Sequence, residues 1–119
     1  MSIQNQINDL FREWDGVTRQ YRTELDAAAS AEVAHKSTRA KFIVAARASD
    51  MKKSAAQAEM EADADDEIGM LYLDRLGKAA AAEATKQRLF MLRARSDALR
   101  SEKVDERANS QFYADNAPV

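Results

Sequence analysis

Apolar residues in the first part of the chain recur at alternating steps of four and three. They are Ile3, Ile7, Leu10, Trp14, Val17 and Tyr21. A repeat of this period keeps one narrow seam on one side of a helix, so the pattern predicts a helix that packs against another helix. Ser2 can act as its N-cap. Beyond Tyr21 we expect the seam to shift to Leu25, and the helix to run from about residue 3 to 48.

Residues 49–53 form the predicted turn, because serine and aspartate side chains there compete for backbone hydrogen bonds. The tetrapeptide Ser54-Ala55-Ala56-Gln57 is typical of a capping box and indicates a new helix. No proline and only two glycines occur between residues 54 and 108, which favours one helix over about 54–108. Residues 109–119 lose the pattern and are expected to fray.

The charge distribution predicts how the two helices pair. Residues 36–53 carry six basic side chains and one acidic one, whereas residues 59–67 carry six acidic side chains and no basic one. Folding back at the turn places these segments side by side, and opposite charges favour that orientation. The predicted fold is therefore all-α, a long antiparallel and coiled-coil-like helical hairpin that forms one domain over residues 1–119.

The second predicted helix has apolar side chains on more than one face. The run Leu89-Phe90-Met91-Leu92 cannot face one partner helix with all four residues. A second contact surface is therefore expected, and self-association into a dimer or a four-helix bundle is the simplest one. We predict that Trp14, Leu89, Phe90, Met91 and Leu92 bind a partner, because large apolar and aromatic anchors dominate the energetics of protein contacts.

Composition narrows the function classes. The formal net charge is −2, from 18 basic and 20 acidic side chains, which argues against wrapping duplex DNA. The chain has no cysteine, so disulfides and thiolate chemistry are excluded. Neither a leader-like N-terminus nor a membrane-spanning apolar stretch is evident, so a cytoplasmic protein without membrane contact is expected. No phosphate-binding loop or nucleophile motif occurs, and we expect no enzymatic activity and no cofactor.

One pair of residues matches a metal-binding spacing. Glu32 and His35 have the Glu-x-x-His spacing by which di-iron bundles place two ligands on one helix face. In the hairpin register Glu67 comes near His35. A dimeric di-iron protein is thus one alternative, although a solvated or interface histidine without metal is the commoner situation.

A second alternative rests on basic residues of the second helix. Arg88, Arg93, Arg95 and Arg100 could form a stripe that holds single-stranded nucleic acid through phosphate contacts, as an accessory protein of replication or recombination would. Acidic residues interrupt the stripe at spacings suited to pairs within the helix, which favours a solvated helix face instead.

Within residues 34–106, the segments 76–84 (LGKAAAAEA) and 92–102 (LRARSDALRSE) resemble small Ala/Arg/Glu-rich helical proteins of tailed bacteriophages. The resemblance implies an accessory protein from an early or recombination region, without an assigned enzymatic activity, acting in the cytoplasm of the host cell. The leading hypothesis is a non-enzymatic helical protein that self-associates and presents an apolar face to a protein or nucleoprotein partner of host or phage.

Overall fold

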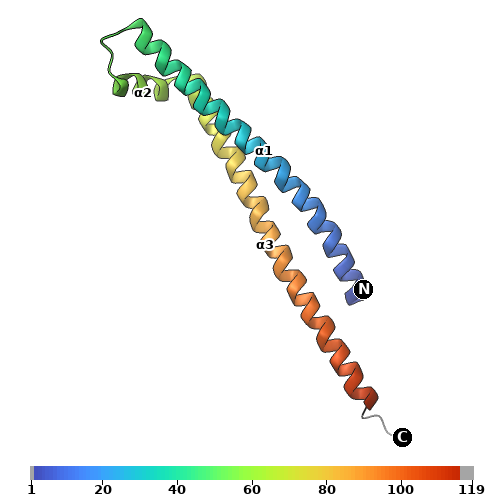
Figure 1. The fold of residues 1–119 in the computed structure, drawn as a ribbon. Helices are drawn as coiled ribbons and strands as arrows, with labels where there is room; N and C mark the ends of the chain where they lie inside the picture. Colours follow the sequence, from blue (N-terminus) through green and yellow to red (C-terminus); the bar gives the residue numbers. More distant parts are fainter. Residues whose placement is uncertain (1, 116–119) are drawn as a thin grey trace. The chain divides into compact units, whose positions relative to one another are not determined.

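The computed structural model describes residues 2–115, which form three α-helices and contain no strand (Figure 1). Helix α1 spans Ile3–Ser49, α2 spans Ala55–Ala64 and α3 spans Asp66–Asp115. The prediction of an all-α fold is confirmed. Tertiary contacts divide the chain into two compact units. Unit 1 combines the chain up to Gln20 with the chain from Thr85 onward, and unit 2 comprises Tyr21–Ala84.

Serine side chains bond to the backbone at both ends of α1. At the start, the Ser2 hydroxyl accepts a hydrogen bond of 3.1 Å from the Asn5 backbone N–H, as the sequence predicts. At the end, the Ser49 hydroxyl lies 3.1 Å from the carbonyl oxygens of Ala45 and Ala46. The Ser2 hydroxyl thus pairs an N–H that the helix leaves unpaired, whereas the Ser49 hydroxyl bonds back onto carbonyls of its own last turn, of which Ala46 also accepts from the Asp50 N–H at 3.2 Å. Helix α1 accordingly ends at Ser49, close to the predicted boundary.

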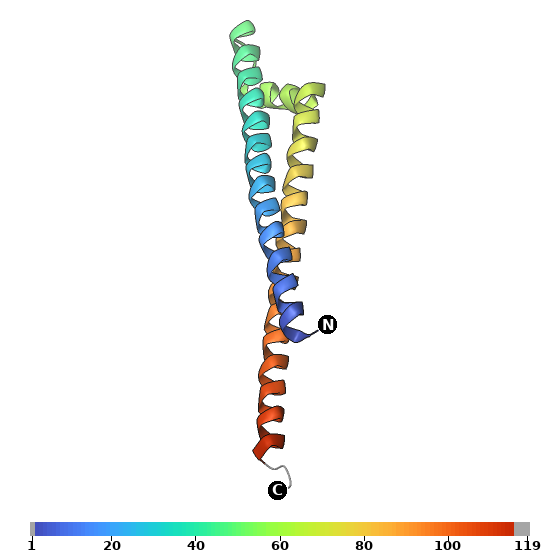
Figure 2. The same ribbon diagram turned by 90° about the vertical axis from the view of Figure 1, so that its right-hand side faces the viewer.

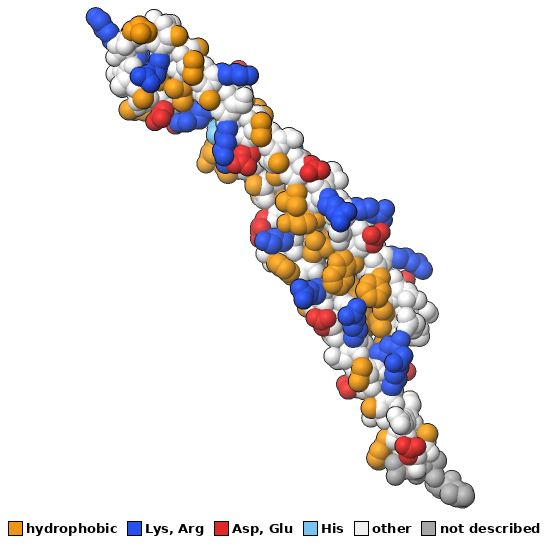
Figure 3. All heavy atoms as spheres, viewed as in Figure 1, with side chains coloured by type: hydrophobic (Ala, Val, Ile, Leu, Met, Phe, Trp, Pro, Cys, Tyr) orange, Lys and Arg blue, Asp and Glu red, His pale blue; other side chains and the backbone are white. Residues whose placement is uncertain are grey.

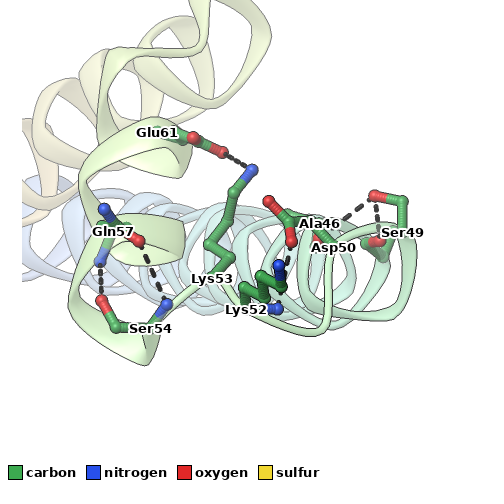
Figure 4. Close-up of polar contacts among 9 residues, drawn as sticks. Ala46, Ser49, Asp50, Lys52, Lys53, Ser54, Gln57 and Glu61 are labelled. Carbon is green, nitrogen blue, oxygen red and sulfur yellow. Dashed lines mark hydrogen bonds and ion pairs between the residues drawn. The ribbon is translucent and has the colours of Figure 1, made fainter.

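The predicted capping box after the turn is confirmed (Figure 4). The Gln57 N–H donates to the Ser54 hydroxyl at 3.1 Å, and the Gln57 side-chain oxygen accepts from the Ser54 N–H at 3.2 Å. In the turn itself the Asp50 carboxylate accepts from the Lys52 N–H at 3.0 Å. The Lys53 ammonium meets the Glu61 carboxylate at 2.6 Å, which ties the turn to α2.

The prediction of one helix over residues 54–108 is wrong, because the chain breaks at Asp65. This residue has extended backbone angles, and its carboxylate accepts a hydrogen bond of 3.1 Å from the Ile68 N–H. Asp65 is thus the N-cap of α3, and Asp66 and Glu67 in the first turn suit the positive end of the helix dipole. The acidic run, which we read only as a partner for basic residues, also starts a helix.

In unit 2, α1 and the first part of α3 run antiparallel. The His35 ring lies 5.2 Å from the Tyr72 ring, and Glu32 pairs with Arg75 at 3.3 Å, so a lower residue number on α1 meets a higher one on α3. Arg39 of α1 pairs with Asp63 of α2 at 2.9 Å. Figure 2 shows α2 crossing between the α1 side and the start of α3. Two α2 residues, Ala58 and Ala62, are 0% exposed. Only a methyl side chain occupies these positions, so α2 packs with its backbone close to its neighbours.

In unit 1, the beginning of α1 packs against α3, again antiparallel. The Arg88 guanidinium pairs with Glu13 at 3.0 Å, and the Lys103 ammonium donates to the Gln4 side chain. The buried core consists of five aliphatic residues, which are Ile7, Leu10, Val17, Leu92 and Leu99. The predicted seam of the first helix therefore forms the core of this unit. Ile3 and Trp14 pack against it while remaining partly exposed.

Beyond Tyr21 the seam does not shift to Leu25, which is 44% exposed. The same alternation of three and four continues through Glu24, Ala28, Ala31 and His35, which are all buried or half-buried. The sequence-based prediction followed the larger apolar side chain. A helix pair with a fixed period instead buries whatever residue the register brings to the contact, including polar ones.

The predicted fraying of residues 109–119 is wrong as far as the structure describes them. Helix α3 continues to Asp115, and residues 116–119 lie outside the described range. Every residue from 104 to 115 is exposed, including Val104, Phe112 and Tyr113. This last segment of α3 is helical without burying a side chain.

Candidate protein-interaction groove

The four consecutive apolar residues of α3 divide between the core and the surface. Leu92 is 6% exposed and belongs to the core of unit 1, and Leu89 packs against that core. Phe90 and Met91 are 51% and 73% exposed. Residues three apart share a helix face, whereas the two between them point elsewhere. The prediction that all four bind a partner is therefore wrong for Leu89 and Leu92, which hold the helices together.

Trp14, the fifth predicted partner-binding residue, lies in a surface groove of unit 1 with a volume of about 430 Å³. Helix α1 contributes Phe11, Trp14, Asp15 and Thr18, and α3 contributes Arg93, Ser96, Asp97 and Arg100. The lower half of Figure 3 shows hydrophobic side chains gathered on the surface with Lys and Arg side chains beside them. Aromatic rings between charged flanks are typical of protein contact sites.

The α1 side of the groove is held by the core beneath it. Trp14 is a seam residue that packs against the core, and Thr18 donates its hydroxyl hydrogen to the Trp14 carbonyl oxygen at 2.8 Å. Phe11 stands one residue after the core residue Leu10 and is 44% exposed. A side chain next to a seam position lies at the edge of the contact between helices. One part of the Phe11 ring therefore lines the groove and another part is exposed to solvent.

The α3 side supplies two cations one heptad apart. The Arg100 guanidinium carbon lies 5.8 Å from the centre of the Phe11 ring, within the range of a cation–π contact. Arg93 lines the groove one heptad earlier, about 10 Å away along the helix axis. Two carboxylates line the same groove: Asp15 on α1, which pairs with Arg19 at 2.9 Å, and Asp97 on α3, which lies between the two arginines. Arg93 and Arg100 are exposed, so an acidic group of a partner can compete with Asp97 for them.

The predicted stripe of four arginines is divided by the structure. Arg93 and Arg100 line the Trp14 groove, whereas Arg95 lines a separate hollow beside Glu13. Arg88 is bound to that same Glu13 at 3.0 Å. Successive helix residues are rotated by about 100°, so the two pairs lie on opposite flanks of the buried face of α3. They do not form one continuous basic track.

His35 and Glu32 take part in a structural cluster of unit 2. The His35 ring is 8% exposed, and its Nδ1 lies 3.2 Å from an Arg75 nitrogen. Arginine can only donate, so Nδ1 accepts and a neutral ring carries its hydrogen on Nε2. The His35 ring also lies against that of Tyr72, with centroids 5.2 Å apart.

Glu32 already has two cationic partners, Lys36 at 2.7 Å and Arg75 at 3.3 Å. The hydrogen bond from Lys36 and the charges of both cations lower the pKa of Glu32 below its ordinary value. Among residues 2–115, no group of three or more His, Cys, Asp or Glu side chains is placed to hold a metal ion. Glu32, His35 and Glu67 therefore form no metal site within the described part of one chain. His35 lines one small hollow together with Ile68, close to the expected register, but the side chain that bonds the His35 ring is Arg75.

Sequence reasoning found Trp14 but missed Phe11 as a groove residue. An aromatic residue immediately after a seam position is a signal that could have found it. Grouping Arg93 with Arg100 and excluding Arg95 requires only their spacing of seven, once the buried face of α3 is known.

No protein-family model, curated protein or solved structure matches this chain. Among the described residues, no helix has both the length and the apolar character to cross a membrane. Fold and groove define a protein of antiparallel helix pairs in which one of the two units carries a groove lined by aromatic rings, two arginines and two aspartates.

Proposed function

We propose that this chain is a non-enzymatic helical interaction protein that binds a protein partner through the Trp14 groove and also self-associates. The observation that carries the proposal is the groove itself, where Phe11 and Trp14 meet Arg93 and Arg100 at the surface. Tryptophan and arginine are the residues most enriched at the energetic centres of protein interfaces. A bacteriophage origin and action in the host cytoplasm belong to the same proposal. Their support is the resemblance of residues 76–84 and 92–102.

The groove favours a partner segment that combines an apolar anchor with carboxylates. An apolar side chain would cover the Phe11 ring and the exposed part of Trp14, and acidic groups on either side would meet Arg93 and Arg100. An amphipathic helix laid along a groove between two helices presents such anchors at intervals of three and four residues. The arginines would then contribute mainly to orientation and association rate, and the aromatic rings to affinity.

The test is affinity capture from a host lysate with the wild type and three variants. Phe11→Ser removes the exposed ring, and Arg93→Glu reverses one flanking charge. Val33→Ser alters an exposed apolar residue of unit 2 and is the control. We expect a protein that the wild type and the control retain and that both groove variants lose. If no captured protein depends on Phe11 or Arg93, the groove is not the binding site.

Binding of single-stranded nucleic acid is a second candidate function. Of the four predicted arginines, Arg93 and Arg100 would make the phosphate contacts. The favouring observation is the stacked pair of Arg100 and Phe11, because a base could extend that stack while the guanidinium groups meet phosphates. Anisotropy of a labelled oligonucleotide over a salt series tests it. Two phosphate contacts give a log–log salt slope of about −1.4, which Arg93→Glu with Arg100→Glu should abolish. Absence of binding at low salt eliminates this candidate.

A further inference from the structure

The side of α3 that faces away from the unit 2 core carries an apolar stripe with nothing packed on it. Its members follow steps of three and four, and all are exposed: Met70, Leu73, Gly77, Ala80 and Ala84. Met70 and Leu73 are 68% and 64% exposed. A Cβ atom added at Gly77 would meet no atom within 4 Å. Such a repeat is the mark of a helix seam, yet this one has no partner within its unit.

The α3 segment of unit 1 continues the same spacing on exposed positions. These are Gln87, Met91, Ala94, Ala98 and Ser101. From residue 70 to 101 no position of this repeat is charged, although about a third of the whole chain is. We call the first five residues stripe A and the second five stripe B.

We propose that stripe A packs antiparallel on stripe B of a second copy of this chain. One alignment brings each large side chain opposite a small one. Met70 faces Ser101, Leu73 faces Ala98, Gly77 faces Ala94, Met91 faces Ala80, and Ala84 faces Gln87, where one residue of each pair comes from the second copy. Alternating large and small residues across a helix contact fills space without voids and lets the backbones approach closely.

Charges beside the stripes favour the same alignment. The positions that flank an antiparallel helix contact bring Asp74 of one copy beside Arg95 of the other. Asp74 shares one carboxylate oxygen with Lys78 of its own helix at 2.7 Å and retains the second oxygen for Arg95. Arg95 is itself exposed. The contact therefore has matching charges as well as matching shapes.

A parallel pair of α3 helices would not match large side chains with small ones. In register, Met91 would face Met91 and Gly77 would face Gly77, which crowds one layer and leaves a gap in another. The flanking positions would bring Asp97 beside Glu102, an unfavourable pair of like charges, and Glu83 beside Arg88, a favourable pair, so the parallel arrangement has no net advantage in charge. The antiparallel arrangement also makes the two contacts of a dimer equivalent by twofold symmetry.

This inference rests on the self-association proposed above and adds its surface and direction. The chain contains no cysteine, so single cysteines can report which positions meet. We would mix Gly77→Cys protein with Ala94→Cys protein under mild oxidation. The antiparallel contact predicts a disulfide-linked dimer of one copy of each, and little product from either variant alone. Dimers formed by each variant alone would indicate parallel helices and overturn the proposal, as would the absence of any cross-linked product.

Charge insertion provides the second measurement. In sedimentation velocity, Leu73→Glu and Met91→Glu should each weaken dimerisation by more than about 100-fold, since every dimer would bury two additional carboxylates. Val44→Glu is the control, because Val44 is 69% exposed on α1 and lies outside both stripes. Helical content by circular dichroism should be unchanged in all three. A wild type that sediments as a monomer, or stripe variants that dimerise like the control, would refute the assignment.

The outcomes also separate this inference from binding at the Trp14 groove. Stripe variants should lose the dimer while retaining the captured partner, and the Phe11→Ser variant should do the reverse. If the stripe variants dimerise like the wild type while the groove variants lose the captured protein, the chain remains an interaction protein that does not use α3 for self-association.

Discussion

Truncation of Leu92 tests the assignment of which side of α3 faces the core of unit 1. Leu92 is 6% exposed, so Leu92→Ala removes buried groups equivalent to about three methylenes, or about 2.4 kcal/mol at 0.8 kcal/mol each. A cavity left by the missing side chain would add to this loss of stability. Two packed helices can move together and close a small cavity, which limits that addition. We therefore expect unit 1 to lose about 2–3 kcal/mol, in the lower half of the range for Leu→Ala in protein cores.

Met91→Ala is the matched control at the neighbouring position. Met91 is 73% exposed, and alanine is the better helix former, so we expect a change within about 0.5 kcal/mol. The two substitutions are one residue apart and remove side chains of similar size. Met91 also belongs to stripe B, so at protein concentrations where the chain is monomeric the difference between the two losses reports the burial of Leu92.

Urea denaturation followed by Trp14 fluorescence is the appropriate assay, because Trp14 is the chain's one tryptophan and packs on the same core as Leu92. Circular dichroism of the same samples reports the helices of both units. Protein concentration should be low and constant, since association raises apparent stability. Equal losses for Leu92→Ala and Met91→Ala, or a larger loss for Met91→Ala, would refute the packing described for α3.

Three further predictions concern other parts of the chain. Ser54→Ala should cost about 1 kcal/mol in urea unfolding by removing the capping-box hydroxyl, whereas Ser54→Asp should retain most of that stability. Gly16→Ala should stabilise α1 by about 0.5–1 kcal/mol in thermal unfolding, because Gly16 is helical and has no atom within 4 Å of an added Cβ. The hydrogen bond from Arg39 lowers the pKa of Asp63 below its ordinary 3.8, so its contribution is present above about pH 4 and is lost as the pH falls further. Stability measured from pH 7 to pH 3 should accordingly fall less steeply in Asp63→Asn than in the wild type.

Local chemistry made the starts of α1 and α2 predictable. Ser2 and Ser54 cap helices because their hydroxyls satisfy nearby N–H groups, which needs no knowledge of the rest of the molecule. The pairing of opposite charges across the turn was predictable for a similar reason, and Arg39 with Asp63 confirms it. The caps depend only on short segments of sequence, and the pairing across the turn depends only on the net charge of two segments.

The break at Asp65 and the continuation of α3 to Asp115 were not predicted. Acidic residues at 65–67 suit both a helix interior facing basic partners and a helix start, and only the packing of α2 decides between them. Residues after 108 lose the apolar pattern, but good helix formers can extend an existing helix at little cost. Absence of a packing signal was therefore mistaken for absence of a helix.

The composition of the groove depended on the register between helices. Trp14 was predictable because a large aromatic at a seam position is conspicuous in the sequence. The side of α3 that meets α1 was not, since Leu89, Phe90, Met91 and Leu92 offer two faces of similar hydrophobicity. Only the contacts of α3 with Leu10 and Val17 in the core settle which arginines stand beside Phe11 and Trp14.

The exposed last turns of α3 give the molecule a gradient of local stability. Helical amides there can open without separating any packed side chains, so they should exchange with deuterium far faster than those around Leu92. A helix of this kind melts from its tip inward while the rest of the unit stays closed. Any molecule that bound Phe112 and Tyr113 would slow deuterium exchange of the amides in this segment. Deuterium uptake at the end of α3 would therefore detect a binding partner whose identity is unknown.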